Sequence, residues 1–351
     1  MPQENLLNPA IIKRLLNQPS PGPAIGRLIG ASASLSAVEL ARAHDGPMML
    51  IANDPRHADQ LEAEIRWFAG EELPVQHFVE WETLPYDSFS PHQDIVSQRL
   101  TVLASLGSFD RGIVIVSGPS LLQRLPPVDY VAARTLQLRQ GQTLDRQAFI
   151  DALGACGYLR VPQVDEHGEF AVRGSLLDVF PMGSNKPLRI DFFDDELESI
   201  RYFSAESQIS ADKVDSIKIL PAREIPLDDK DVRYFRERYR ERFEGQPSKS
   251  RVYREVSEGI AHGGIEYYLS LFFETTASLA DYLPKGTMIF APTDLQQTLE
   301  QSWREAVERY ELCRFDPERP ILEPHEVFSD AATITDKLQR FHYVVYSGQS
   351  L

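Results

Sequence analysis

Apolar residues follow two different periods along the first third of the chain. Met48–Ala52 and Ile113–Val116 are short, continuous apolar runs of the kind found in buried parallel strands. Between them a helical period begins at Pro55 and ends at Gly70, with apolar side chains at Ala58, Leu61, Ile65 and Phe68. Strands that alternate with amphipathic helices over residues 25–127 predict a parallel sheet covered by helices.

The pattern changes after Val131. A helical stretch at Leu144–Cys156 is followed by strand-like segments separated by turn residues, at Val172–Phe180, Leu188–Phe193 and Ser199–Phe203. Successive strands joined by short turns predict an antiparallel meander rather than a continued parallel sheet. We therefore expect an inserted α+β domain over residues 131–220, after a first α/β domain at residues 1–130.

The last part of the chain predicts a return to the first layer. A charged helix is expected at Asp231–Phe243, and the aromatic-rich segment Ile265–Phe273 precedes a short strand at Thr287–Phe290. Residues 221–351 are accordingly expected to form a second α/β domain that returns to the first sheet. Because the sequence stops soon after a strand-like run, we expect the polypeptide to continue beyond Leu351.

One predicted strand carries an unusual set of side chains. In Leu188–Phe193, Leu188, Ile190 and Phe192 share one face, while Arg189, Asp191 and Phe193 share the other. Arginine and exposed aromatic side chains are enriched where proteins bind partners. The second face is therefore predicted to contact a protein partner; the alternative is that Phe193 covers a second core.

Composition narrows the classes of function. The 351 residues carry a net charge of −16, which disfavours broad electrostatic binding to nucleic acid. The two cysteines, Cys156 and Cys313, are far apart in sequence, which argues against a disulfide framework or a zinc site and fits a reducing cytoplasm. No export or membrane-spanning segment is expected.

Other candidate chemistry is weak. The acidic residues Asp191, Asp194, Asp195 and Glu196 are more typical of a solvated turn than of a metal or acid–base site. The aromatic and proline residues of Trp81–Pro91 could stack on bases, but the surrounding acids favour a packed loop. The histidines have no recognisable nucleophile partner.

Four stretches carry a family resemblance. They are WETLPYDSFSPHQDIVSQRL at Trp81–Leu100, EHGEFAVRGSLLDVFPMGS at Glu166–Ser184, LRIDFFDDELESIR at Leu188–Arg201 and GIEYYLSLFFE at Gly264–Glu274. Together they resemble the N-terminal, UvrB-like region of the bacterial transcription-repair coupling factor (Mfd) family. The resemblance implies a helicase-like (RecA-like) parallel-sheet domain with an inserted α+β domain that contains an antiparallel sheet, in a UvrB-like arrangement.

The same resemblance implies a degenerate nucleotide site. A phosphate-binding loop reads G-x-x-x-x-G-K-[ST], and Gly30 keeps only its first glycine, because Leu35, Ser36 and Ala37 replace the second glycine, the lysine and the hydroxyl residue. The acidic pair that UvrB carries after a later strand is replaced by Ala291-Pro292-Thr293. The resemblance thus implies no catalysis, cofactor or metal in this chain, with ATP and magnesium used only by a translocase motor beyond residue 351.

The resemblance also implies a partner. In the family this region docks UvrA, the damage-recognition ATPase of the excinuclease, which recruits nucleotide excision repair to polymerases stalled at DNA lesions. Matching the motifs assigns that contact to Arg173, Arg189 and Phe193, with Asp191 and Arg201 flanking them. RNA polymerase and DNA would bind through regions absent here. The alternatives are a UvrB-like repair protein that binds DNA or uses ATP, and a small-molecule enzyme on an α/β scaffold.

Overall fold

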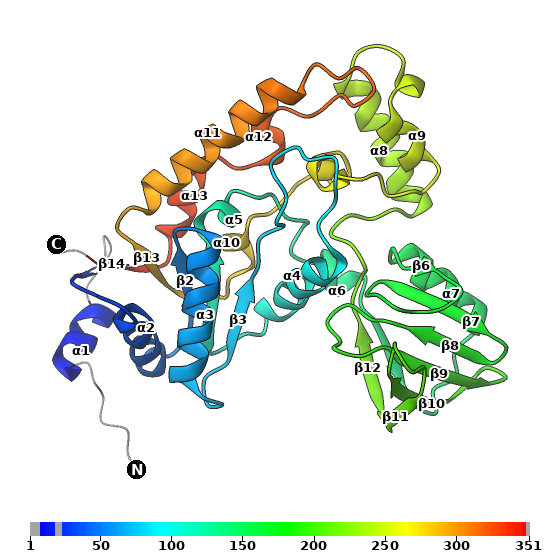
Figure 1. Cartoon of the computed structure of the whole chain (residues 1–351), viewed down its shortest axis with the longest axis horizontal. Helices are drawn as coiled ribbons and strands as arrows, with labels where there is room; N and C mark the ends of the chain where they lie inside the picture. The colour runs from blue at the N-terminus through cyan, green and yellow to red at the C-terminus, as the bar shows by residue number, and fades with distance from the viewer. Residues whose placement is uncertain (1–7, 18–22, 349–351) are drawn as a thin grey trace.

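The computed structural model describes residues 8–17 and 23–348. The outermost parts of the first and last predicted domains, residues 1–7 and 349–351, lie outside the described residues, as does segment 18–22. A parallel sheet and a separate, mostly antiparallel sheet lie side by side (Figure 1). The predicted combination of a helicase-like α/β layer with an inserted α+β domain is confirmed.

Six parallel strands form the first sheet. Their order is β1 (Ala24–Ile25), β14 (His342–Tyr346), β13 (Met288–Pro292), β2 (Pro47–Ala52), β4 (Gly112–Ser117) and β3 (Val75–Phe78). Every residue of β2, β4 and β13 is buried, as expected for strands with helices on both faces. Because β13 and β14 pair beside β2, the sheet joins segments from the first and last predicted ranges.

Helices cover both faces of this sheet. One face packs against α1 (Pro9–Asn17), α2 (Ser32–Ala43) and α3 (Pro55–Ala69). The other packs against α4 (Gln93–Leu106), α5 (Gly118–Leu121), α11 (Leu295–Cys313) and α13 (Ala331–Leu338). Helix α3 begins and ends as predicted, because the Asp54 side chain accepts a hydrogen bond from the His57 N–H and Gly70 adopts φ +61°.

The inserted domain is a meander covered by one helix. Its sheet has the order β11 (Ser210–Lys213), β10 (Glu196–Phe203), β9 (Leu188–Phe193), β8 (Leu176–Val179), β7 (Glu169–Arg173) and β6 (Leu159–Arg160). Helix α7 (Arg146–Ala155) covers the inner face, where Phe149 lies 6.5 Å from Phe192 between ring centroids. A pair formed by β5 (Leu136–Arg139) and β12 (Ser216–Ile219) and the short α6 (Tyr130–Ala133) complete the region.

One predicted strand is wrong. The segment expected as a single strand at Val172–Phe180 is a hairpin, in which β7 and β8 are joined at Gly174 and Ser175. Gly174 has φ +60°, a conformation that glycine adopts without steric cost, so the chain reverses there. Arg173 therefore lies on β7, with β8 between it and β9.

A third, helical region packs beyond the parallel sheet. It contains α8 (Asp229–Arg242), η1 (Pro247–Lys249), α9 (Arg251–Ser257), η2 (Ile265–Leu271), α10 (Leu279–Tyr282) and α12 (Pro324–Val327). The loop after β3 is held against it, since buried Trp81 and Tyr86 both contact Tyr267, with centroid distances of 5.6 and 5.7 Å. The predicted packing of the Trp81–Pro91 loop is confirmed at these two aromatic residues.

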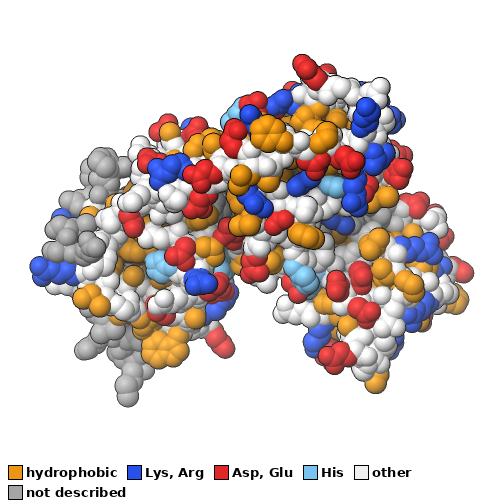
Figure 2. Space-filling view, turned by 45° about the horizontal axis from the view of Figure 1, so that its top comes forward, with side chains coloured by type: hydrophobic (Ala, Val, Ile, Leu, Met, Phe, Trp, Pro, Cys, Tyr) orange, Lys and Arg blue, Asp and Glu red, His pale blue; other side chains and the backbone are white. Residues whose placement is uncertain are grey.

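Buried and polar contacts join the two sheets. Arg99 of α4 is fully buried; its Nε donates to Glu224 at 2.5 Å and its guanidinium stacks on Phe78. The His167 imidazole is hydrogen bonded to Asp94 of α4 at 2.6 Å. Figure 2 shows the surface hollowed between the two regions, with acidic and basic side chains interspersed rather than gathered into one basic tract. Within residues 8–17 and 23–348, no helix combines the length and apolar character needed to cross a bilayer.

Candidate functional site

The strand register gathers five predicted residues on one face of the inserted sheet. Arg173 pairs with Leu176 and Leu176 with Asp191, while Arg189 pairs with Arg201, and directly paired residues point to the same side. We call this surface, opposite α7, the outer sheet face; it carries Arg173, Arg189, Asp191, Phe193 and Arg201. The predicted residues therefore lie together although they come from three strands.

Burial along β9 follows the predicted alternation. Leu188, Ile190 and Phe192 are buried, whereas Phe193 is 68% exposed. A small second cluster does exist on the outer sheet face, formed by Val164, Ala171 and Phe203, but Phe193 is not part of it. The alternative in which Phe193 covers a second core is therefore wrong, and its ring stands in solvent.

Arg189 is already paired within the chain. Its Nε and Nη2 donate to the two carboxylate oxygens of Asp178, each at 2.8 Å, and its guanidinium stacks 4.7 Å from the Phe203 ring centroid. This hydrogen bond raises the pKa of Arg189. The sequence did not identify Asp178, although an acid inside the apolar run LLDVF signals a need for a buried cation. Asp178 thus forms a bidentate ion pair with the Arg189 guanidinium within the chain.

The remaining predicted residues differ in exposure, since Asp191 and Arg201 are half-buried. Arg173 is exposed and donates to the Pro162 carbonyl at 2.9 Å, and Asp191 accepts a hydrogen bond from Ser175 at 3.0 Å. Arg201 lies between Arg189 and Lys213 in the strand register. Cations that face one another directly repel, so an acidic group placed beside this row would stabilise it.

The acids after β9 form a turn, as predicted. Asp194 and Asp195 are exposed and join β9 to β10, with Asp194 at φ +53°. Glu196 pairs with Phe193 in the register, also exposed. These carboxylates flank the exposed ring rather than converge on a metal-binding point.

The residues that match a phosphate-binding loop lie at or just before the start of helix α2. Gly30 has φ +59° and turns the chain into α2, which begins at Ser32. Leu35, Ser36 and Ala37 consequently lie inside the helix, and Ser36 and Ala37 are buried. Ser36 and Ala37, at the positions where a phosphate-binding loop carries its lysine and its hydroxyl residue, are thus packed inside the protein.

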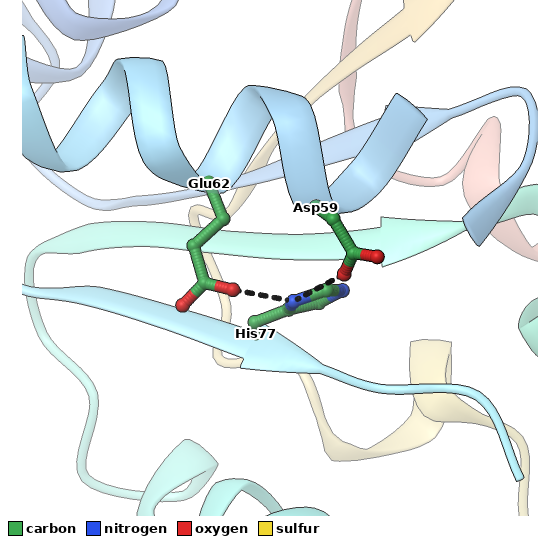
Figure 3. Close-up of side chains that lie close together, drawn as sticks. All are labelled: Asp59, Glu62 and His77. Carbon is green, nitrogen blue, oxygen red and sulfur yellow. Dashed lines mark hydrogen bonds and ion pairs between the residues drawn. The ribbon is translucent and has the colours of Figure 1, made fainter. Parts of the chain in front are cut away.

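Two acids and a histidine form a separate cluster between α3 and β3 (Figure 3). The His77 imidazole is 2.7 Å from a Glu62 oxygen and 3.9 Å from Asp59. This hydrogen bond, together with Arg66 at 2.7 Å, lowers the pKa of Glu62 to about 2. Since Glu62 interacts with both Arg66 and His77, the cluster links helix α3 to strand β3 of the sheet.

Comparison with known proteins identifies the family. Residues 136–225, which include the whole outer sheet face, match the sequence model of the UvrB interaction domain. The chain is 42% identical over 305 residues to the transcription-repair-coupling factor of Escherichia coli K12, covering 87% of this chain and 26% of that protein. It is 36% identical over 335 residues to the Haemophilus influenzae protein of the same name, covering 95% and 29%.

The Myxococcus xanthus transcription-repair-coupling factor is similar as well, with 31% identity over 344 residues, 89% of this chain and 28% of that protein. The chain thus spans between 26% and 29% of the length of these relatives. The matches cover most of the chain and agree with the UvrB-like arrangement of its two sheets. The chain therefore belongs to the transcription-repair-coupling factor family.

Proposed function

We propose that this chain is a docking module that recruits the excinuclease protein UvrA, and that the outer sheet face makes the contact. The match to the UvrB interaction domain covers this face, and the similar relatives are named transcription-repair-coupling factors. The observation that carries the proposal is Phe193, which is 68% exposed at the end of a strand whose other face is fully packed. An exposed apolar ring at the end of a strand is suited to a partner's pocket.

Phe193, Arg173 and Arg201 would each make a different contribution to binding. Phe193 would supply apolar area that is desolvated on contact, while Arg173 would meet an acidic group at the far side of the same face. Arg201, beside Arg189 and Lys213 in the register, would add positive potential. A partner patch with a pocket ringed by carboxylates fits these features.

Arg189 would act chiefly by positioning. Its pairing with Asp178 joins β8 to β9, the strand that ends at Phe193. A partner carboxylate would approach the row of Arg189, Arg201 and Lys213 from the Arg201 side, where more than one of these cations could bind it. Replacing Arg189 should therefore lower the affinity for UvrA in two ways. It removes the link between β8 and β9, and it removes a positive charge.

The proposed module has no nucleotide chemistry of its own. Leu35, Ser36 and Ala37 lack the groups that reach phosphate and magnesium, and they lie inside α2. ATP-dependent translocation, with its ATP and magnesium, and contacts to RNA polymerase and DNA would belong to the remainder of a longer protein. In that protein, the docking module would bring repair to a polymerase stalled on damage.

A binding titration tests the proposal. The chain and its Phe193→Ala, Arg173→Glu and Phe315→Ala variants would be titrated against purified UvrA by calorimetry. Phe193→Ala and Arg173→Glu should each weaken binding by about tenfold or more. Phe315→Ala is the matched control, because that ring is 74% exposed far from the outer sheet face, and it should leave affinity unchanged.

Two results would contradict this function. Unchanged UvrA affinity for both outer-face variants, with the fold intact by circular dichroism, would show that the contact lies elsewhere. Saturable ATP binding, or retention of duplex DNA at physiological salt, would instead favour a UvrB-like repair protein that uses nucleotide. Salt dependence separates these cases, since DNA affinity falls steeply with ionic strength.

A further inference from the structure

A compact turn lies at the end of the inserted sheet opposite to Phe193. Strand β10 runs antiparallel to β9, so residues 204–209, which follow β10 and lead into β11, lie at the end where β9 begins. Phe193 is the last residue of β9, so about 17 Å of strand separates it from that end. The row of Arg189, Arg201 and Lys213 lies between the turn and Phe193 in the strand register.

The turn is closed by its own hydrogen bonds. The Gln208 N–H donates to the Ser204 carbonyl at 2.7 Å, and the Ser204 N–H donates to the Ile209 carbonyl at 3.1 Å. The Gln208 side-chain amide donates to the Ala205 carbonyl at 2.7 Å. Gln208 also has φ +58°, a conformation that persists in a non-glycine residue only where neighbouring contacts hold it. These contacts fix the direction of the chain through the turn.

Arg189 holds this turn against the sheet. Its Nε and Nη2 bind Asp178, while its Nη1 donates to the Gln208 carbonyl at 3.2 Å and to the Ser210 hydroxyl at 3.4 Å. One guanidinium therefore links β8 and β9 to the chain between β10 and β11. All three of its nitrogens donate within the chain, and the side chain is 19% exposed. This geometry makes Arg189 a positioning residue for the turn.

Ile209 stands between the two groups that the Arg189 Nη1 binds. It is 70% exposed, slightly more than Phe193, although isoleucine is among the most commonly buried residue types. A single exposed apolar side chain is ordinary on a protein surface. Ile209 differs because hydrogen bonds hold the backbone on both sides of it. A side chain on an ordered backbone costs a partner less conformational entropy when it is bound.

We propose that Ile209 is a second apolar anchor for UvrA, and that Arg189 presents it by holding the 204–209 turn. The inference rests on the proposed docking function and adds a contact that the family resemblance did not assign. Phe193 and Ile209 would each enter an apolar pocket on UvrA, and the cationic row would meet acidic groups between the two pockets. Two anchors at the two ends of one strand fit within an interface of about 800 Å² on each partner.

Calorimetric titration with purified UvrA tests the anchor through a size-matched pair of variants. Ile209→Leu keeps an apolar side chain and should bind like the parent chain. Ile209→Asn has a side chain close in size to leucine but polar, and should weaken binding by about tenfold. Ile29→Asn is the matched control, because Ile29 is 79% exposed and precedes α2 in the parallel-sheet domain (Figure 1). It should leave UvrA affinity unchanged.

The positioning role of Arg189 has a separate measurement. Glu206 lies in the turn, so cleavage after it by a glutamate-specific protease, followed by mass spectrometry, measures how often the turn opens. Arg189→Lys keeps the charge but loses the planar fork, and should speed this cleavage by about tenfold. Arg160→Lys is the matched control, because Arg160 is exposed on β6 at the opposite edge of the sheet.

A double variant connects the two residues. If Arg189 acts through the turn, the losses of UvrA affinity in Arg189→Lys and Ile209→Asn should combine to less than their product. Fully multiplicative losses, or equal cleavage after Glu206 in Arg189→Lys and the parent chain, would overturn the presentation of Ile209 by Arg189.

The titration separates this inference from the docking function. If Phe193→Ala weakens UvrA binding and Ile209→Asn does not, the docking function stands and the second anchor is wrong. If neither variant weakens binding, the docking face itself is wrong and the anchor fails with it. Equal losses in Ile209→Asn and Ile29→Asn would also overturn the anchor, because they would show no preference for the inserted sheet.

Discussion

The two sheets of this chain bury their strands in different ways. Strands β2 and β4 of the parallel sheet are buried at every residue, because helices pack on both faces. Strand β9 of the inserted sheet alternates buried and accessible residues, because α7 covers only one face. A sheet covered on both sides can present chemistry only at the edge where its strands end, whereas a half-covered sheet can present a whole face.

The two surfaces also differ in charge. A crevice at the edge of the parallel sheet is lined by carboxylates from Asp54, Glu80, Asp294 and Glu305. The outer sheet face places Arg189, Arg201 and Lys213 in one row beside an exposed ring. A charged group that suits one surface would be repelled by the other, so the two surfaces of this acidic chain differ in their electrostatic preference.

The largest expected effect concerns the seam between the two sheets. Arg99→Leu leaves buried Glu224 without its cation and should lower the free energy of unfolding by about 3–5 kcal/mol, measured by urea denaturation. Adding Glu224→Leu should recover most of that loss, because an apolar pair removes the unpaired charge. Arg56→Leu, on the exposed side of α3, is the control. A double variant no more stable than Arg99→Leu alone would contradict this account.

The next effect is confined to the inserted sheet. Asp178→Ala removes both hydrogen bonds to Arg189 and should cost about 2–3 kcal/mol of stability, measured by urea denaturation. The neighbouring Asp191→Ala should change stability by less than about 0.5 kcal/mol, since Asp191 has a single exposed hydrogen bond. Asp178→Ala should also weaken UvrA binding through Arg189; full affinity in this variant would show that Arg189 is not positioned by Asp178.

A pH dependence is expected beside the parallel sheet. Burial raises the pKa of Glu266 from 4.5 to about 7, although Ser90 donates a hydrogen bond to it at 2.9 Å. Because the folded chain binds this proton more tightly than the unfolded chain, the resulting stability is greatest below pH 4.5 and is lost as pH rises to about 7. Glu266→Gln should flatten the stability profile in this window, as followed by thermal melts. An unchanged slope would exclude Glu266 as its origin.

The smallest effect is expected at the tie between α3 and β3. Glu62→Gln weakens the hydrogen bond to His77 and should cost about 1 kcal/mol at neutral pH. The hydrogen bond from His77 lowers the pKa of Glu62 from 4.5 to about 2, so its contribution is present above pH 4.5 and is lost as pH falls toward 2. Glu72→Gln, an exposed control after the same helix, should match the parent chain at every pH.

Local patterns were sufficient to predict much of the fold. The buried runs at β2 and β4, the limits of α3 and the alternation in β9 follow from side-chain periodicity and from capping residues, which act within a few positions. The hairpin at Gly174 was missed because we predicted one strand from the apolar residues on both sides of it, although Gly174-Ser175 is a two-residue turn signal. A short-range signal for the turn was therefore present in the sequence, but the strand pairing that it produces is seen only in the structure.

The sequence by itself determined the two sheet types, the acidic balance and the side chains that share the face of β9 with Phe193. Only the tertiary structure decided that Asp178 occupies the guanidinium of Arg189 and that Asn53, Gln123 and Asp294 surround one crevice. Periodicity fixes which way a side chain points from its own strand, because it depends on local backbone geometry. The group that lies opposite a given side chain depends on strand register and on contacts between residues hundreds of positions apart. These are set by the packing of the whole chain.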